Sequence, residues 1–299
     1  MKVERIDRVI LNVRNLEESV RFWSDVFGLV FPAYAPKGKV QHLLSEHAGP
    51  VERSPSRPAV SPFGIELLQK VPPVEPEGIR SLALEVADID AAKAELKAKK
   101  VRLLQEIVID GFREAFFHPD DLHGVRLALV SYSSQRETGN KGAQPSHPLK
   151  LEKLDRVGLN VLDCAQAEKF WTDTLGLYFP PKSHDPDRIR QRGAVTHTYT
   201  QWATPDDKAR PIAAIASIGL EIMQRDPPLG IQGFRGIVLK VSDLVAARAH
   251  MLSKGMRLQH TITVGDIFKE DFFHPDDTHG VRIALCEYKA PEPTLKTPV

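Results

Sequence analysis

Two stretches of this sequence occur twice, and the repetition limits what the chain can fold into. Residues 4–32, ERIDRVILNVRNLEESVRFWSDVFGLVFP, recur at 152–180 as EKLDRVGLNVLDCAQAEKFWTDTLGLYFP, an offset of 148. Residues 116–129, FFHPDDLHGVRLAL, recur at 272–285 as FFHPDDTHGVRIAL, an offset of 156. Between these stretches, matching residues lie 155 apart, so the second half carries two loop insertions. Self-similarity of this kind predicts two halves with the same fold.

A shorter pattern lies inside each half. The sequence Leu-x-Val-x-Asp/Asn begins at Leu11, Leu84, Leu159 and Leu239. Its alternation suits a half-buried strand, and its last residue is a good N-cap for the helical pattern that follows, as at 16–27 and 89–100. Short apolar runs after each helix, such as 64–69 and 125–130, predict three further strands. We therefore expect a βαβββ module four times.

Domain boundaries follow from composition along the chain. Residues 133–148, SSQRETGNKGAQPSHP, are rich in turn formers and poor in large apolar residues, which is typical of a linker. We therefore predict a first domain at 1–132, a second at 149–290 and a frayed tail at 291–299.

Composition excludes several classes of partner. The chain of 299 residues has a formal net charge of +1, so it has no overall excess of positive charge for nucleic acid. No apolar run suits a secretory signal or a membrane span, and the only cysteines are Cys164 and Cys286. Cys164 stands at a predicted helix start, where we interpret it as a packing residue. We expect a cytoplasmic monomer or homodimer that binds a small molecule and neither nucleic acid nor membrane.

The four modules carry motifs that resemble a known family. FWSDVFGL and FWTDTLGL follow the first strand of each half, and FFHPDD-x-HGV precedes the last strand. With these motifs the chain resembles the vicinal oxygen chelate superfamily, which includes glyoxalase I, extradiol dioxygenases, bleomycin-resistance proteins and methylmalonyl-CoA epimerase. The HP-x-x-x-HGV run is most similar to the epimerase branch. The resemblance implies an α+β fold in which modules pair into two cup-shaped half-barrel domains.

The resemblance also implies a divalent metal in the cup. Family members hold it with His, Gln or Glu at one position on the first and last strands of each module. The residues that align with these positions are Arg8, Glu66, Ser81 and Ala128 in the first half and Arg156, Glu221, Gly236 and Ala284 in the second. Arg, Ala and Gly side chains are not ordinary metal ligands. The usual metal is therefore not expected at these positions, and the cofactor stays open.

Strand alternation separately indicates which side chains face each cup. Val9 and Leu11 form an apolar face that should pack on helices, which leaves the intervening residues on the concave face. The same reasoning along the other strands gives each cup one carboxylate, two arginines and an asparagine. They are Glu66, Arg8, Arg126 and Asn12 in the first half, and Glu221, Arg156, Arg282 and Asn160 in the second.

Two interpretations of these residues are open. In the functional one, Glu66 and Glu221 are catalytic bases, while the arginines and asparagines bind a carboxylate or carbonyl substrate and stabilise an enolate in place of a metal. In the structural one, the Arg8–Glu66 pair fills the space of a lost metal and has no catalytic role.

Histidines provide further candidates. His42 and His197 match across the repeat on predicted second strands, so we include both as candidate catalytic residues, although a lone strand histidine is more often structural. The histidines of HPDD-x-HG look more prominent. We interpret that segment as a turn that sets the entry to the last strand.

The leading hypothesis is a vicinal oxygen chelate-type enzyme that abstracts a proton from a small oxygenated metabolite, as an epimerase, isomerase or lyase does. One alternative is an extradiol-type ring-cleaving dioxygenase, which needs iron or manganese held by two histidines and a carboxylate. The other is a metal-free drug or metabolite binding protein of the bleomycin-resistance type.

Overall fold

Strand β1 (Val3–Asn12) leads through a capped turn into helix α1 (Leu16–Phe27), and this arrangement occurs four times. In each case the polar residue that ends the Leu-x-Val-x-Asp/Asn pattern accepts a backbone N–H of the helix. These residues are Asn15, Asp88, Asp163 and Asp243. The predicted strand–cap–helix units are therefore confirmed.

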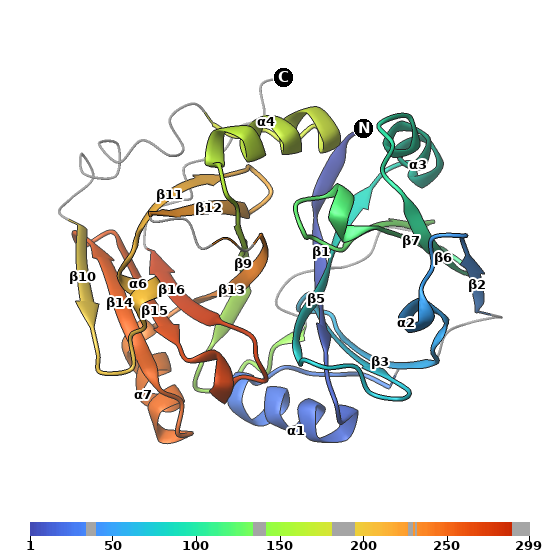
Figure 1. Cartoon of the computed structure of the whole chain (residues 1–299). Coiled ribbons are helices and arrows are strands. Elements are labelled where there is room, and N and C mark those ends of the chain that lie inside the picture. Colours follow the sequence, from blue (N-terminus) through green and yellow to red (C-terminus); the bar gives the residue numbers. More distant parts are fainter. Residues whose placement is uncertain (34–39, 134–141, 181–194, 227–229, 231, 289–299) are drawn as a thin grey trace. The chain divides into compact units, whose positions relative to one another are not determined.

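The computed structural model describes residues 1–33, 40–133, 142–180, 195–226, 230 and 232–288. It divides into two compact units, one built mainly on residues up to Gly142 and the other mainly on residues from Ala143. Each unit contains an eight-stranded sheet that curls into a half-barrel (Figure 1). The predicted tail and half of the predicted linker, residues 134–141, lie outside the described residues.

The first sheet has the strand order β2-β6-β7-β8-β5-β1-β4-β3. Its strands after β1 are β2 (Gln41–Leu44), β3 (Ser56–Ser61), β4 (Ile65–Lys70), β5 (Gly78–Val86), β6 (Leu103–Ile109), β7 (Phe112–Phe117) and β8 (Leu127–Tyr132). Helix α2 (Pro50–Arg53) connects the two edge strands β2 and β3, and α3 (Ile89–Ala98) packs on β7 and β8.

The second sheet repeats this order as β10-β14-β15-β16-β13-β9-β12-β11. Its strands are β9 (Leu151–Asn160), β10 (Val195–Tyr199), β11 (Arg210–Ile215), β12 (Leu220–Asp226), β13 (Gly233–Val241), β14 (Leu258–Val264), β15 (Phe268–Phe273) and β16 (Ile283–Tyr288). Helix α4 (Cys164–Leu175) follows β9, α6 (Pro205–Lys208) connects the edge strands β10 and β11, and α7 (Leu244–Ser253) packs on β15 and β16.

One strand of each first module pairs with the other module. β2 pairs antiparallel with β6, so that His42 lies opposite Ile107, and β10 pairs in the same way with β14. The two edge strands of each sheet are therefore consecutive along the chain, and the segment that joins them contains a short helix, α2 or α6. This arrangement brings residues of those helices over the concave face.

Residues Asp7 to Asn12 of β1 are all buried, so burial does not by itself separate the two faces of this strand. Val9 and Leu11 are at most 1% exposed, and β1 runs parallel to β4 with Ile10 opposite Glu66. The register of β1 against β5 shifts at three places, one of which lies between Ile6 and Arg8. Such a β-bulge lets the neighbouring side chains of Asp7 and Arg8 meet.

The layer outside the sheets is apolar. Trp23 and Trp171, in matching positions of α1 and α4, are fully buried. Cys164 is buried at the start of α4, and burial raises the pKa of its thiol to about 11, which agrees with a packing role. No helix in the described part of the chain has the length and apolar character needed to cross a bilayer.

The HPDD-x-HG segments are turns, as predicted. Each forms a single turn of 3₁₀ helix, at Pro119–Asp121 and at Pro275–Asp277. The preceding residue, His118 or His274, accepts a backbone N–H through Nδ1 at 3.3 Å and so acts as a cap.

Candidate functional site

Two polar clusters line the concave face of each half, with an apolar layer between them. We name each cluster after its central arginine. In the first half the Arg8 cluster comprises Asp7, Arg8, Glu66, Glu114 and Tyr132, and the Arg126 cluster comprises Glu52, Lys70, Arg80 and Arg126. In the second half the Arg156 cluster comprises Asp155, Arg156, Glu221, Glu270 and Tyr288, and the Arg282 cluster comprises Asp206, Asp207, Arg225, Arg235, His260 and Arg282.

The Arg8 guanidinium is fully engaged by protein carboxylates. Its Nε donates to Glu66 at 2.5 Å, its Nη1 to Asp7 at 2.5 Å and its Nη2 to Glu114 at 2.7 Å. Burial alone would lower the pKa of Arg8, but the three carboxylates raise it well above its usual value. The predicted Arg8–Glu66 ion pair is therefore present, and Arg8 has its hydrogen bonds within the protein.

Glu114 is the proton-holding member of this cluster. Burial raises the pKa of its carboxyl to about 8; Arg8 opposes the shift, and Glu66 and Asp7 add to it. A carboxyl with such a pKa keeps its proton at neutral pH.

The Arg156 cluster contains the same residue types in a looser arrangement. Arg156 Nη2 donates to Glu270 at 2.7 Å, but its Nε lies 3.8 Å from Glu221 and has no hydrogen-bond partner among the described residues. Burial raises the pKa of Glu270 to about 7, with Arg156 opposing and Glu221 contributing. Glu270 therefore changes its protonation near neutral pH.

The layer between the clusters differs between the halves. In the first half it is filled by a buried apolar group that includes Ile10, Leu104 and Phe116. The second half has glycine, Gly158, where the first has Ile10, and the substitution leaves a cavity of about 100 Å³. The cavity is lined by Glu221 and Glu270 of the Arg156 cluster and by Arg225, Arg235 and Arg282 of the Arg282 cluster.

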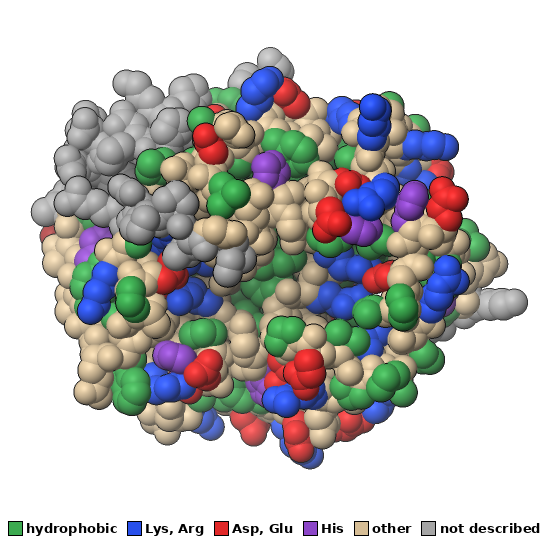
Figure 2. Space-filling view, viewed as in Figure 1, with side chains coloured by type: hydrophobic (Ala, Val, Ile, Leu, Met, Phe, Trp, Pro, Cys, Tyr) green, Lys and Arg blue, Asp and Glu red, His purple; other side chains and the backbone are tan. Residues whose placement is uncertain are grey.

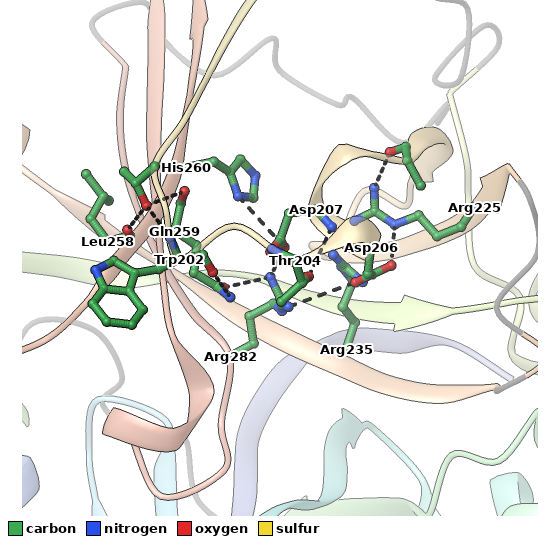
Figure 3. Close-up of polar contacts among 12 residues, drawn as sticks. Trp202, Thr204, Asp206, Asp207, Arg225, Arg235, Leu258, Gln259, His260 and Arg282 are labelled. Carbon is green, nitrogen blue, oxygen red and sulfur yellow. Dashed lines mark hydrogen bonds and ion pairs between the residues drawn. The ribbon is translucent and has the colours of Figure 1, made fainter.

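The Arg282 cluster contains more cations than carboxylates (Figure 3). Arg282 Nη1 donates to Asp207, and to Gln259 at 3.0 Å, while Arg235 Nη1 donates to Asp206 at 2.8 Å. Three arginines thus share two aspartates. Buried N–H groups on Arg225 Nε and Arg235 Nη2 have no hydrogen-bond partner in the described part of the chain.

His260 belongs to the same cluster as a neutral ring. It stacks on Phe272, with ring centroids 4.1 Å apart and planes 7° from parallel. Burial lowers the pKa of His260 to about 4, and Asp207, which lies 3.8 Å from Nδ1, only partly opposes the shift.

The predicted site residues do not all lie together. Arg126 is separated from Arg8 and Glu66, because Ala128, not Arg126, lies level with Arg8 across β5. Its Nη1 instead donates to Glu52 at 2.7 Å. Arg282 bears the same relation to Arg156. The expected single polar site is thus two clusters in each half.

The asparagines and histidines diverge between the halves. Asn12 Nδ2 donates to the carbonyls of Val74 and Pro76 and so holds a loop, whereas Asn160 Oδ1 accepts from Arg235 at 3.4 Å. His42 and His197 are both exposed on edge strands, but only His197 lines the cavity.

Several site residues were not predicted. They match across the repeat at the same offsets as the predicted ones: Glu114 and Glu270, Glu52 and Asp207, Lys70 and Arg225, Arg80 and Arg235. Lys70 also lies four residues after Glu66 on one strand, which puts both on the same face. Pairing by offset and parity could have identified those on strands, whereas Glu52 and Asp207 lie on short helices in loops, where parity does not apply.

The aligned metal positions do not fit a divalent ion. The Glu66 carboxylate accepts a hydrogen bond from Arg8 Nε. The other two positions of the first half are Ser81 and Ala128, both fully buried. Gly236 and Ala284 stand there in the second half. No group of three or more His, Cys, Asp or Glu side chains is placed to hold a metal within the described residues.

Comparison with solved structures finds the same fold over nearly the whole chain. The Mn(II)-bound glyoxalase from Novosphingobium aromaticivorans is 13% identical, with a TM-score of 0.57, and the match covers 96% of this chain and 82% of that one. The 2,3-dioxygenase LapB from Pseudomonas sp. KL28 is 14% identical, with a TM-score of 0.57 and coverage of 98% and 96%. A mutant 4-hydroxymandelate synthase from Streptomyces coelicolor is 12% identical, with a TM-score of 0.59 and coverage of 98% and 94%.

Comparison with curated proteins gives no match. The model of one family matches both halves, at residues 5–129 and 153–285. The chain therefore belongs to the Glyoxalase/Bleomycin resistance protein/Dioxygenase superfamily, the vicinal oxygen chelate fold that its repeats predict.

Proposed function

We propose that the second half is the active site of an enzyme that abstracts a proton from a small anionic, carbonyl-bearing metabolite. The observation that carries the proposal is the cavity of about 100 Å³, which joins an arginine-rich end to a carboxylate end. The cavity is small, so the proposed substrate is a small acid.

The arginine-rich end supplies the binding chemistry. Arg225 and Arg235 each present a buried N–H without a hydrogen-bond partner in the described residues. A carboxylate oxygen would satisfy these donors and balance the excess positive charge of the Arg282 cluster. Leaving them unsatisfied costs about 1–3 kcal/mol for each group, so an anionic ligand is favoured.

The other end supplies the proton transfer. In the proposed step, Glu221 takes a proton from the carbon next to the substrate carbonyl, and the C–H electron pair forms the enolate. Arg156 contacts both Glu221 and Glu270 from behind the cavity wall, and its positive charge stabilises the developing enolate electrostatically. Return of the proton to the opposite face or to another atom gives epimerisation or isomerisation, and neither outcome requires a co-reactant.

Glu270 completes this arrangement as a proton store. Its pKa of about 7 lets it release or take up a proton at working pH, and it shares Arg156 with Glu221. General acid–base groups are most effective when their pKa lies near the working pH.

Solvent exchange tests the proposal even when the product is unidentified. The protein is incubated in D₂O with a panel of small 2-oxo acids, 3-oxo acids and substituted malonates, and loss of the carbon-bound proton is followed by NMR. We expect enzyme-dependent exchange for at least one member. Glu221→Gln should lower its rate by about 10²–10⁴-fold, and Glu152→Gln, which removes a surface carboxylate paired with Lys240, should not change it.

Exchange at the wild-type rate in Glu221→Gln would contradict the proposed base. A panel member that binds but is released unchanged, with no exchange, would favour the metabolite-binding alternative, for which the unpartnered arginine donors are equally suitable. The ring-cleaving alternative needs two histidines and a carboxylate as metal ligands, and the described residues offer no such group.

A further inference from the structure

The Arg126 cluster of the first half is charge-unbalanced although it is buried. Lys70 is 4% exposed, and the side chains of Glu52, Arg80 and Arg126 are 8%, 11% and 12% exposed. Three cations against one carboxylate leave a formal charge of +2. Buried charges in proteins are normally paired, so this excess calls for an explanation.

The contacts within the cluster do not neutralise the excess. Glu52 accepts from Arg126 Nη1 at 2.7 Å and from the backbone N–H of Gly49 at 2.8 Å. Arg80 approaches Glu52 only to 3.7 Å, beyond hydrogen-bond distance. Lys70 Nζ donates to the carbonyl of Ser54 at 3.0 Å and has no carboxylate in contact among the described residues.

The next carboxylate towards the apolar layer is Glu114, which interacts with Arg126 but belongs to the Arg8 cluster. Its raised pKa leaves it largely protonated at neutral pH, so it supplies little counter-charge. Arg126 Nε is buried without a hydrogen-bond partner in the described residues. Burial and the two arginines lower the pKa of Lys70 to about 8, which shows how unfavourable its charge is here.

We propose that the Arg126 cluster binds a phosphate group, as inorganic phosphate or as a phosphate ester. A dianion matches the formal charge of the cluster, and the N–H groups of Lys70, Arg80 and Arg126 supply the donors that phosphate oxygens accept. Arg80 and Arg126 keep some exposure, and basic side chains are recessed in the surface of the first half in Figure 2, so an ion reaches the cluster from solvent.

This site is distinct from the proposed active site. It lies in the first half, where Ile10 and Phe116 fill the layer next to it. Lysine stands at position 70, whereas the second half has Arg225 there, and a single carboxylate, Glu52, stands against the pair Asp206 and Asp207. The first half thus has the greater excess of positive charge, and the second half has the cavity between its two clusters.

Phosphate binding is measured by calorimetric titration and by the thermal midpoint of unfolding, with sodium chloride at matched ionic strength as the control. We expect phosphate to raise the midpoint of the wild type and chloride to leave it nearly unchanged. Glycerol phosphate in place of inorganic phosphate distinguishes an ester ligand from the free ion, and malonate distinguishes phosphate from any dianion.

Lys70→Met removes one cation and keeps the length of the side chain. It should weaken phosphate binding by about tenfold or more, the usual effect of one charge-assisted hydrogen bond. Without phosphate it should unfold at the same or a higher temperature, because a repelled buried cation is gone. Lys70→Arg, which copies position 225, should retain binding, as should Lys97→Met on the exposed face of α3.

A wild-type protein with no phosphate-specific stabilisation would overturn the proposal. So would equal affinities for Lys70→Met and Lys97→Met, or loss of binding in Arg225→Met alone, which would place the ion in the second half. Because the exchange assay depends on Glu221 and this titration on Lys70, either proposal can fail without the other.

Discussion

The two halves share their charged residues and differ in what separates them. Both have a central arginine on the first strand, two glutamates beside it and a basic cluster at the other end of the cup. In the first half Ile10 lies between the clusters, and in the second Gly158 leaves a cavity. Duplicated charges alone therefore do not distinguish the two halves, and the proposal that the second half is active depends on the volume of one residue between the clusters.

The same difference is visible at the central arginines. Arg8 makes hydrogen bonds to three carboxylates at 2.5–2.7 Å, whereas Arg156 makes one at 2.7 Å and keeps Nε unpartnered among the described residues. The structural interpretation of the pair suits the first half, and the functional one suits the second. The sequence could not decide between these interpretations, because the same arginine and glutamate stand at matching positions in both halves.

The largest expected effect comes from the paired glutamates. Glu221→Gln should lower proton exchange by about 10²–10⁴-fold, the usual contribution of a general base. Glu66→Gln should lower stability instead, by about 1–3 kcal/mol, because it leaves the buried Arg8 Nε with a weaker partner. Exchange rates and urea unfolding of both variants test the contrast, and equal loss of exchange in the two would show that both halves are active.

Filling the cavity should turn the second half into a copy of the first. In Gly158→Ile the added Cβ would lie 3.2 Å from the end of the Met223 side chain, which is flexible and can move by the few tenths of an ångström required. At Gly236, by contrast, an added Cβ would lie 2.5 Å from the backbone oxygen of Arg282, so a larger residue does not fit there. Gly158→Ile should lower ligand affinity by about a hundredfold, since the ligand competes for the same volume. Calorimetric titration of the best exchanging panel member measures the loss, and an unchanged affinity would place the ligand elsewhere.

The reverse change tests the first half. Ile10→Ala opens the apolar layer, and the lost packing should cost about 2–5 kcal/mol in unfolding free energy without creating exchange activity. Denaturant unfolding measures the cost. An Ile10→Ala protein that gained exchange would show that the first half needs only space to act.

Stability should depend on pH through the two buried carboxyls with raised pKa values. Glu270 at about 7 and Glu114 at about 8 hold protons in the folded protein that the unfolded chain has released above its ordinary value of 4.5. Folding then takes up protons, so their contribution to stability is complete below pH 4.5 and is lost as the pH rises through 7 to 8.

Variants isolate this contribution from that of other groups. Between pH 5 and pH 8 the unfolding free energy of Glu270→Gln, and that of Glu114→Gln, should each fall less steeply than that of the wild type. The effect of Glu270→Gln should end at the lower pH, because the pKa of Glu270 is lower than that of Glu114. The measurement is urea unfolding across that range. A pH slope that is the same in the wild type, Glu270→Gln and Glu114→Gln would contradict the raised pKa values.

Much of the fold could be predicted because its determinants are local. The Asp or Asn caps, the turn at HPDD and the apolar alternation of Val9 and Leu11 each act within a few residues. The Arg8–Glu66 pair also follows, since parallel neighbours of the same parity face one side. Predicting these features requires only the order of the strands and the alternation of side chains along them.

The rest depends on three-dimensional detail that no local pattern carries. The bulge that brings Asp7 to Arg8 breaks the alternation on which the prediction rests. Glu52 and Asp207 reach the cups from short helices in loops whose path depends on the closure of the sheet. The cavity results from Gly158 beside Gly236, a difference in side-chain volume that charge patterns do not record.

The smallest expected effect is at the paired histidines. His197 lines the cavity, and burial together with Arg225 lowers the pKa of its imidazole, so the ring is neutral at pH 7 and above. A neutral ring offers the ligand one ordinary hydrogen bond or packing contact. His197→Ala should therefore weaken ligand affinity by about two- to tenfold, with no change in this ratio between pH 7 and pH 9.

His42→Ala is the matched variant, because His42 lies exposed on β2 with the filled first cup behind it. Its ligand affinity and exchange rate should equal those of the wild type. Calorimetric titration of the best exchanging panel member against both variants makes the measurement. A loss of ligand affinity of a hundredfold or more in His197→Ala would indicate that this histidine takes a direct part in the reaction. An equal loss in His42→Ala would contradict the proposed difference between the first half, where Ile10 fills the space between the clusters, and the second half, where Gly158 leaves it open.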